Sequence, residues 1–319
     1  MMEKPPAPMH AEATWLNVAL TWNCTISCAH CFQERVKVDL PDGAADDFIR
    51  QALEQGLANH VSASGGEPFL RFGEMISLGR LVRSLGASFD VITNASWCAS
   101  PEIARRKVAR LAEETGISVI SVSCDAFHGA FVPVENILNL AAAARECGIA
   151  VKAQVMRANT DDDLKTAALV ERVKPHIDGV HYVDYIPMAA ATAPSGRHPR
   201  TPDKMDLRCF AIIDTEKNLC YITPDGNVYP CCAPGVHPNF AVGNLLSEPS
   251  GELIRRLARD NLFKAIGGEG FLGLLGRLAP SLRKRYMERA YLSTCELCHH
   301  MMSDAATVSA LNEAVPRFT

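Results

Sequence analysis

The sequence predicts an α/β protein built around a parallel sheet, and two observations lead to this fold class. From residue 15 to about residue 187, short apolar runs alternate with amphipathic runs at helical spacing, which is typical of repeated strand–helix units. The chain has 319 residues and 48% hydrophobic content, enough for one large core and a smaller appended domain. We expect six strands, at 16–22, 60–64, 89–93, 117–123, 150–156 and 180–186. Six such units are fewer than the eight of a closed barrel.

The segments between these strands have the apolar faces of packed helices. Met75, Leu78 and Val82 recur at helical spacing, and Ser100 followed by Pro101 combines an N-cap hydroxyl with a proline at the first helical position. The rhythm of strands and helices stops near 189–203, where alanine, proline, glycine and basic residues predominate. This composition predicts a linker to a second unit.

Charge and composition exclude several classes of partner. A formal net charge of -4 lacks the basic excess that is typical of nucleic-acid binding, and no apolar run has the length of a membrane span. The first fourteen residues contain no apolar core of an export signal. Twelve cysteines in such a chain favour metal ligands and free thiols over disulfides. We therefore expect a cytoplasmic protein with no nucleic-acid or membrane partner.

Three cysteines near the amino end carry the strongest chemical signal. Cys24, Cys28 and Cys31 have CxxxCxxC spacing and supply three thiolates, whereas a structural zinc site or an ordinary iron–sulfur cluster uses four protein ligands. A cluster held by three cysteines keeps one iron open to a small molecule. The pattern therefore indicates an enzyme, with a zinc knuckle as the alternative interpretation.

This motif, with His30 at the ring position before the last cysteine, resembles the signature of the radical S-adenosylmethionine (SAM) superfamily. The resemblance implies a partial (β/α)6 TIM-like barrel and a 4Fe-4S cluster whose open iron binds the amine and carboxylate of SAM. It further implies reductive cleavage of SAM to a 5'-deoxyadenosyl radical, which abstracts a hydrogen atom from substrate. An electron donor such as flavodoxin or ferredoxin would reduce the cluster.

Polar motifs follow the later strands, at the carboxyl ends where ligands gather in parallel α/β folds. Residues 64–68 resemble the GGEP element of the family, which receives the amino group of SAM, and glycines allow close approach of the backbone. By resemblance, groups at the next strand ends would contact the ribose and the methionyl carboxylate, although such groups often only cap a helix or complete a turn. We interpret His128 as an exposed loop residue. The residues expected at the SAM site are His30, Gly65, Gly66, Glu67, Pro68, Thr93, Asn94, Ser123, Asp125, Gln154 and Arg157.

A second cysteine group follows the linker. Residues 219–231 predict two strands joined by a Pro-Asp-Gly turn, and Cys295 and Cys298 form a CxxC pair further on. The group is similar to the SPASM extension or its shortened form, called twitch, a small α+β iron–sulfur domain. This resemblance implies one auxiliary 4Fe-4S cluster held by Cys209, Cys231, Cys295 and Cys298. Cys220 is the rival of Cys209, and a zinc ribbon is the alternative to iron.

The predicted organisation is an N-terminal extension at 1–14, the barrel at 15–195, the auxiliary-cluster domain at 205–302 and a C-terminal tail at 303–319. Cys232 stands beside a ligand without a ligand role of its own, and a thiol readily donates a hydrogen atom to a carbon radical. By resemblance to epipeptide-forming epimerases, we expect Cys232 to act in L-to-D epimerisation of a ribosomally made peptide; a plain buried thiol is the other interpretation. One alternative function is a dehydrogenase or a carbon–carbon or thioether cross-linking enzyme, acting on a peptide or small molecule, in which the auxiliary cluster accepts an electron. A zinc-binding structural protein is the minor alternative.

Overall fold

A computed structural model describes residues 15–33, 36–186, 191–205, 207, 209, 219–231 and 237–318. Within these ranges nine strands form one sheet, in the order β6-β5-β4-β3-β2-β1-β7-β8-β9. The N-terminal extension and Cys232 lie outside the described residues. The predicted α/β class is confirmed.

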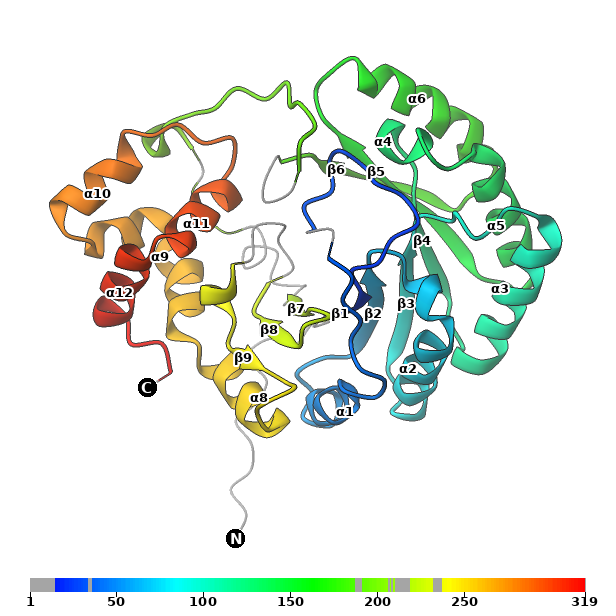
Figure 1. The fold of residues 1–319 in the computed structure, drawn as a ribbon, viewed down its shortest axis with the longest axis horizontal. Helices are drawn as coiled ribbons and strands as arrows, with labels where there is room; N and C mark the ends of the chain where they lie inside the picture. The colour runs from blue at the N-terminus through cyan, green and yellow to red at the C-terminus, as the bar shows by residue number, and fades with distance from the viewer. Residues whose placement is uncertain are drawn as a thin grey trace, which may run out of the picture.

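Six parallel strands form the barrel part of the sheet, and the first five are each followed by helical structure (Figure 1). Their bounds agree with the predicted ones to within two residues. The strands are β1 (Trp15–Thr21), β2 (His60–Gly65), β3 (Ser88–Thr93), β4 (Val119–Ser123), β5 (Ala150–Arg157) and β6 (Gly179–Asp184). Because all six run in parallel, their carboxyl ends meet at one edge of the sheet.

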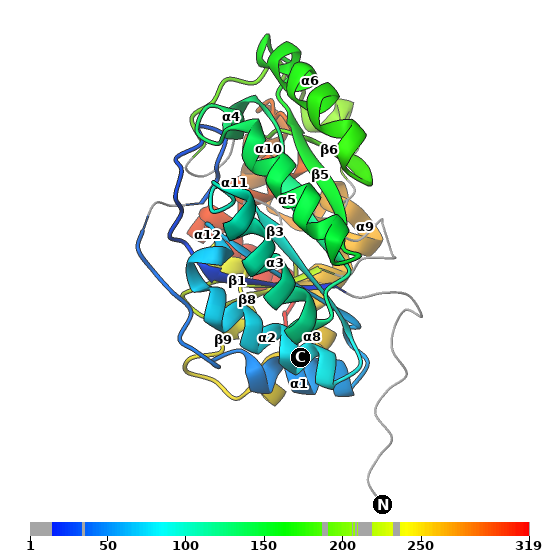
Figure 2. The ribbon, with the colours of Figure 1, turned by 90° about the vertical axis from the view of Figure 1, so that its right-hand side faces the viewer.

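The barrel helices form one layer over the outer face of these strands (Figure 2). As predicted, the Ser100 side chain caps α3 by accepting a hydrogen bond from the Ile103 N–H, and Gly116 ends this helix with a left-handed backbone. The longer helices are α1 (Asp46–Glu54), α2 (Phe72–Ser84), α3 (Pro101–Thr115), α5 (Val134–Glu146) and α6 (Asp162–Val173). Short helical turns are η1 (Pro68–Arg71), α4 (Ala126–Gly129) and η2 (Lys174–His176).

The sheet continues past β1 into the second unit, which the sequence pattern does not predict. Strand β7 (Leu219–Ile222) pairs in parallel with β1, and β8 (Asn227–Tyr229) and β9 (Gly243–Asn244) extend it in antiparallel pairing. The predicted Pro-Asp-Gly hairpin is thus present. Its first strand covers the edge of β1 that would otherwise expose unpaired backbone groups.

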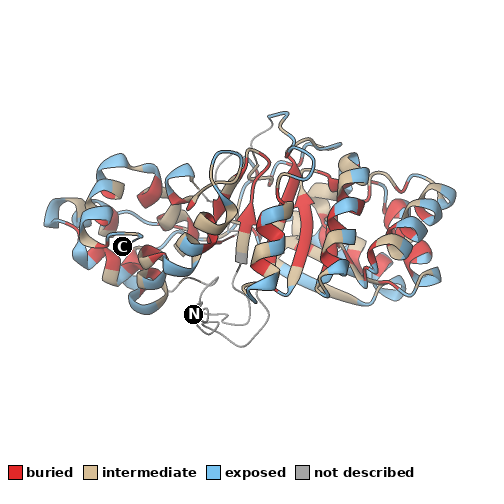
Figure 3. Ribbon diagram, turned by 90° about the horizontal axis from the view of Figure 1, so that it is seen from below, coloured by how far each residue is buried: buried red, intermediate tan, exposed pale blue. Residues whose placement is uncertain are grey.

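The helices after α8 build a second apolar core beside the hairpin, whereas α8 packs on the barrel core through Leu253 and Ile254. Tyr229 and Phe240 pack there with Leu274 and Leu297 from two of the helices, and Leu311 in the expected C-terminal tail belongs to the same core. The elements are η3 (Pro202–Lys204), η4 (Pro238–Phe240), α8 (Ser250–Arg259), α9 (Asn261–Arg277), α10 (Pro280–Met287), α11 (Thr294–Ser303) and α12 (Ala305–Ala314). Figure 3 shows buried residues along the strands and on the inner sides of the helices. Among the described residues, no helix is long and apolar enough to span a membrane.

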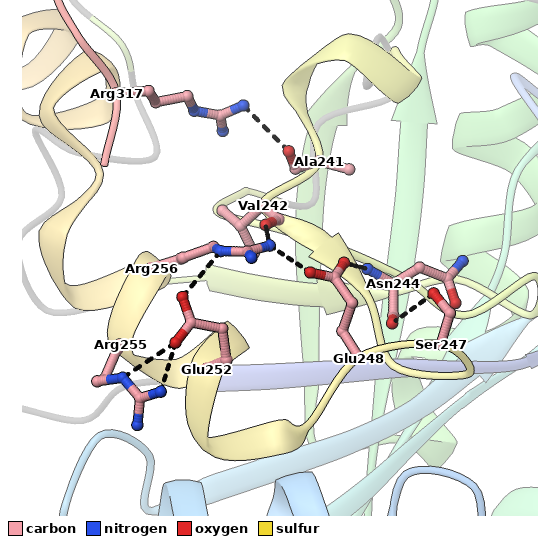
Figure 4. A network of polar contacts seen from close by, with 9 residues as sticks. All are labelled: Ala241, Val242, Asn244, Ser247, Glu248, Glu252, Arg255, Arg256 and Arg317. Carbon is pink, nitrogen blue, oxygen red and sulfur yellow. Dashed lines mark hydrogen bonds and ion pairs between the residues drawn. The ribbon is translucent and has the colours of Figure 1, made fainter. Parts of the chain in front are cut away.

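Polar networks join β9, α8 and the chain end (Figure 4). Arg256 donates to the Val242 carbonyl at 3.1 Å and pairs with the carboxylates of Glu248 and Glu252. Arg317 donates to the Ala241 carbonyl at 3.0 Å and, outside the figure, pairs with the fully buried Asp260. These contacts fix the segment that contains η4. This segment follows Cys231 and Cys232 in the chain.

Candidate functional site

The loop after β1 carries Cys24, Cys28 and Cys31, and the segment after β2 holds it in place. The Gly66 N–H donates to the Thr21 carbonyl at 2.7 Å, and the Glu67 N–H donates to the Asn23 carbonyl at 2.9 Å. A Cβ atom on Gly66 would lie 2.1 Å from the Asn23 oxygen, and Gly65 has a φ of +126°. Only glycine fits at these two positions. The predicted GGEP element therefore packs directly against the cysteine loop.

Glu67 points into the protein and not toward open space. Its carboxylate, on a residue 1% exposed, accepts hydrogen bonds from the Thr93 hydroxyl at 2.8 Å, the Asn94 N–H at 2.8 Å and the Phe69 N–H at 3.1 Å. Burial raises the pKa of Glu67 to about 7, although these donors oppose the shift. We propose that Glu67 positions the end of β3 against the cysteine loop and does not contact SAM directly.

Asn94 connects β3 to the first cysteine. Its amide nitrogen Nδ2 lies 3.5 Å from Cys24 Sγ and 3.3 Å from the Thr25 hydroxyl. Burial raises the pKa of Cys24, and the Glu67 carboxylate and the Cys31 thiol add to the rise. The proximity of Cys31 and Cys24, and the amide donor beside one sulfur, are the arrangement expected around a shared cluster.

His30 lies in an aromatic group between the cysteine loop and the ends of β4 and β6. The centroid of its ring is 4.8 Å from those of Phe127 and His128, and 6.3 Å from that of Tyr185. Its Nδ1 is buried without a hydrogen-bond partner among the described residues. Burial, assisted by His128, lowers the pKa of His30 to about 4, so the imidazole is neutral near pH 7.

The interpretation of His128 as an exposed loop residue is wrong, because its side chain is only 17% exposed. It lies on α4 and its Nδ1 is 2.9 Å from the Asp125 carboxylate. That carboxylate also accepts the backbone N–H groups of Phe127 and Met156. Burial would raise the pKa of Asp125, but the side chain and backbone N–H of His128, together with the nearby His30 ring, hold it below its usual value. The Asp125 carboxylate thus orients His128 and caps α4.

The other expected SAM residues are spread along the same edge. Ser123 and Gln154 are partly buried at β4 and β5, and Pro68 begins η1. Arg157 is exposed at the end of β5, where it pairs with Asp184 at 2.9 Å. The structure therefore brings Thr93, Asn94 and the diglycine to the cysteine loop, and leaves Arg157 in contact with β6 instead.

The second cysteine group is assembled from distant segments. Burial raises the pKa of Cys298 well above its usual value, with the nearby Cys295 and Cys209 thiols adding to the rise. Cys231 and Cys209 belong to the same C-terminal core as Cys298. Cys220 instead lies on β7 opposite Leu16 and packs against the barrel core. This placement favours Cys209 over Cys220 as the first ligand.

The residues present fit the implied cofactors. Three thiols occupy one loop at the carboxyl end of the first parallel strand, closed by backbone that only glycine can supply. Soft thiolates suit iron–sulfur clusters, and a second set of four cysteines is available in the C-terminal unit. A cluster at the first loop would be held by Cys24, Cys28 and Cys31.

Comparison with known proteins agrees with this arrangement. Residues 209–299 match the family model of the SPASM iron–sulfur cluster-binding domain. A putative peptide biosynthesis protein, YydG of Bacillus subtilis strain 168, is 20% identical over 310 residues, which cover 92% of this chain and 93% of YydG.

Solved structures show the same fold at low sequence identity. SuiB of Streptococcus suis bound to precursor peptide SuiA has a TM-score of 0.58 at 17% identity, covering 81% of this chain and 67% of SuiB. In the SAM-bound form of SuiB, the match spans 60% of that protein. The enzyme anSMEcpe with bound SAM has a TM-score of 0.52 at 13% identity, over 94% of this chain and 93% of its own. The chain therefore carries a C-terminal SPASM-type iron–sulfur domain, and its cysteine motif and fold resemble those of radical SAM enzymes.

Proposed function

We propose that this enzyme modifies a ribosomally made peptide, by inverting L residues to D residues. The observation that carries the proposal is the relationship to YydG, a putative peptide biosynthesis protein that aligns over nearly the whole of both chains. Shared length matters here because the barrel and the cysteine-rich unit are both included in the alignment. The structural similarity to SuiB in complex with its precursor peptide supports a peptide substrate.

Several residues would hold the cofactors. Cys24, Cys28 and Cys31 would bind the first cluster, and Cys209, Cys231, Cys295 and Cys298 one auxiliary cluster. When bound, the reduced cluster and SAM supply a carbon radical that removes a hydrogen atom from the substrate. The Gly65–Gly66 backbone packs closely against the cysteine loop, and Asn94 donates toward the Cys24 sulfur. Glu67 holds the end of β3 in position against the cysteine loop.

Cys232, which lies outside the described residues, would return the hydrogen atom. Its S–H bond breaks and a new C–H bond forms on the opposite face of the α carbon, so the peptide keeps its composition and changes its configuration. The cysteine is left as a sulfur radical and recovers its thiol by taking one electron and one proton. The electron comes from the external one-electron donor, a protein of the flavodoxin or ferredoxin class, in a cytoplasmic setting.

The test uses small peptides encoded beside the gene, treated with reconstituted enzyme, SAM and dithionite in deuterated water. We expect a gain of one mass unit per inverted residue, since the thiol carries solvent deuterium, and a D residue after hydrolysis and chiral analysis. Cys232→Ala should still cleave SAM but form no D residue. Cys147→Ala is the matched control, because Cys147 caps α5 far from either cysteine group in the sequence.

A loss of two mass units would overturn epimerisation in favour of the second candidate, oxidation or cross-linking with the auxiliary cluster as electron acceptor. Normal formation of D residues by the Cys232 variant would keep epimerisation and remove Cys232 from the mechanism.

A further inference from the structure

We propose that Cys28, His30 and His128 form a binding site for a single zinc-class divalent cation, which the chain occupies when its first iron–sulfur cluster is absent. This site goes beyond the proposed function and shares only one ligand, Cys28, with the cluster. A cation bound there and the cluster therefore exclude each other.

The three side chains already converge. Cys28 Sγ and one ring nitrogen from each of His30 and His128 lie within 4.8 Å of one another. In a tetrahedral zinc site with one sulfur and two nitrogen ligands, neighbouring ligand atoms are about 3.3–3.6 Å apart, as the metal–ligand bond lengths require. The side chains therefore need to close by roughly 1 Å, which rotamer adjustments supply.

His128 is oriented as a metal ligand by its neighbours. Its Nδ1 lies between 2.9 and 3.0 Å from both oxygens of Asp125, and Asp125 is itself held by the backbone N–H groups of Phe127, His128 and Met156. An ionised carboxylate accepts the Nδ1 proton, so Nε2 carries the lone pair. A carboxylate behind a histidine is the usual outer contact of protein metal sites, and it fixes the direction of the ring.

His30 gives a second, independent observation. The residue is only 9% exposed, and its Nδ1 is buried with no hydrogen-bond partner among the described residues. A buried polar atom without a partner costs free energy. A cation bound by the imidazole would offset that cost. One ring nitrogen would then bind the metal, and the N–H of the other ring nitrogen would be more strongly polarised.

Binding requires one proton to leave. Cys28 enters the site as a thiolate, so its thiol proton goes to solvent, while both imidazoles bind as neutral rings. Water completes the fourth position. The bound cation removes one of the three thiolates that the cluster needs, so zinc loading before cluster assembly would hold the enzyme in an inactive form.

The first experiment titrates Co2+, a spectroscopic substitute for Zn2+, into the full-length chain after its iron has been removed. Three proteins are compared: wild type, His128→Ala and His60→Ala. His60 is a matched control, since its Nε2 lies 3.0 Å from Asp90 and its side chain is 18% exposed, against 17% for His128. The C-terminal cysteines also bind Co2+, so the readout is the difference between variants in bound equivalents and in visible tetrahedral absorption.

We expect His128→Ala to bind one equivalent fewer than wild type and His60→Ala to bind the same number. Equal stoichiometry and spectra in wild type and His128→Ala would overturn the proposal, as would an equal loss in both variants. Circular dichroism of each apo protein shows that the comparison is made on folded chains.

The second experiment tests the exclusion. Zn2+ at one equivalent above the C-terminal capacity is added before iron and sulfide, and the iron bound per chain is measured. Because zinc then fills the C-terminal cysteines in both proteins, wild type should bind almost no iron, whereas His128→Ala should keep about half of the full content, that is one of two clusters. Equal inhibition in the two proteins would contradict a role of His128 in zinc binding.

Discussion

The two cysteine groups of this protein are built in opposite ways. Cys24, Cys28 and Cys31 lie within one loop, and backbone hydrogen bonds from the diglycine segment hold that loop. The C-terminal cysteines come from segments separated by many residues and are brought together by an apolar core that includes Tyr229, Phe240 and Leu297. The first site is local and depends on backbone geometry, whereas the second depends on long-range packing.

This difference has a physical consequence for each site. Changing a cysteine in the first loop removes a ligand and leaves the surrounding backbone contacts intact. Changing the packing of the second unit alters the distances between its ligands, because nothing local fixes them. Loss of cofactor without loss of stability is therefore expected at the first site, and coupled losses at the second.

The largest effect is expected for Cys31→Ala. The remaining two thiolates do not hold a cluster in the first loop, so iron should fall from about eight to about four atoms per chain and deoxyadenosine formation should fall to background. The midpoint of thermal unfolding of the apo protein should stay close to that of wild type. A variant that unfolds at a much lower temperature would break the comparison, since the first site would then not be local.

Cys209→Ala sharpens the comparison at the second site. We expect about four iron atoms per chain in this variant and the full content in Cys220→Ala, because Cys220 packs in the barrel core on β7. Iron analysis after anaerobic reconstitution shows which of the two cysteines is a ligand. The reverse result would make Cys220 the ligand, and a colourless protein that carries zinc would support the structural alternative.

Arg317→Met tests the dependence of the second site on packing. The Arg317 side chain is 9% exposed and pairs with Asp260, which is fully buried, and it also donates to carbonyls around η4. Removing one partner of a buried pair costs about 3–5 kcal/mol. We expect that loss in the free energy of unfolding, together with a loss of auxiliary-cluster iron.

Arg255→Met is the control for this prediction, because Arg255 pairs with Glu252 on an exposed helix face and should leave stability at the wild-type value. Full iron content in a strongly destabilised Arg317→Met protein would show that the ligands are held without the packing.

Glu67→Gln gives the smallest effect and concerns the first site. The pKa of Glu67 is raised from 4.5 to about 7, so the folded chain binds more protons than the unfolded chain in that interval. The stability of wild type should therefore fall as pH rises from 4.5 to 7 and level off above, with a change of about 2 kcal/mol between pH 5.5 and 7.5. Chemical denaturation of both apo proteins at several pH values isolates this group. An equal pH slope in the variant would contradict the assignment.

The sequence predicts the barrel well because its signals are local. Strand alternation, the Ser100–Pro101 helix start and the CxxxCxxC motif each depend on residues close together in the chain. The pairing of β7 with β1 joins residues about two hundred positions apart, and a four-residue strand carries no information about its partner.

The sequence also does not predict the orientation of individual side chains. The GGEP element predicts a SAM-site role for Glu67, and the sequence does not show that three donors from neighbouring segments bind its carboxylate. His128 follows a strand end like any loop residue, and only the fold brings it to His30 and Asp125. Deciding whether Cys209 or Cys220 is the cluster ligand likewise depends on which of the two apolar cores each cysteine packs against.

The claim on which the account depends is that the first loop holds a cluster with an open iron that cleaves SAM. The most direct measurement is the yield of 5'-deoxyadenosine and methionine from anaerobically reconstituted enzyme, SAM and dithionite. We expect equal amounts of the two products from wild type and none from Cys31→Ala. Enzyme that contains its full iron content and releases no deoxyadenosine would contradict it.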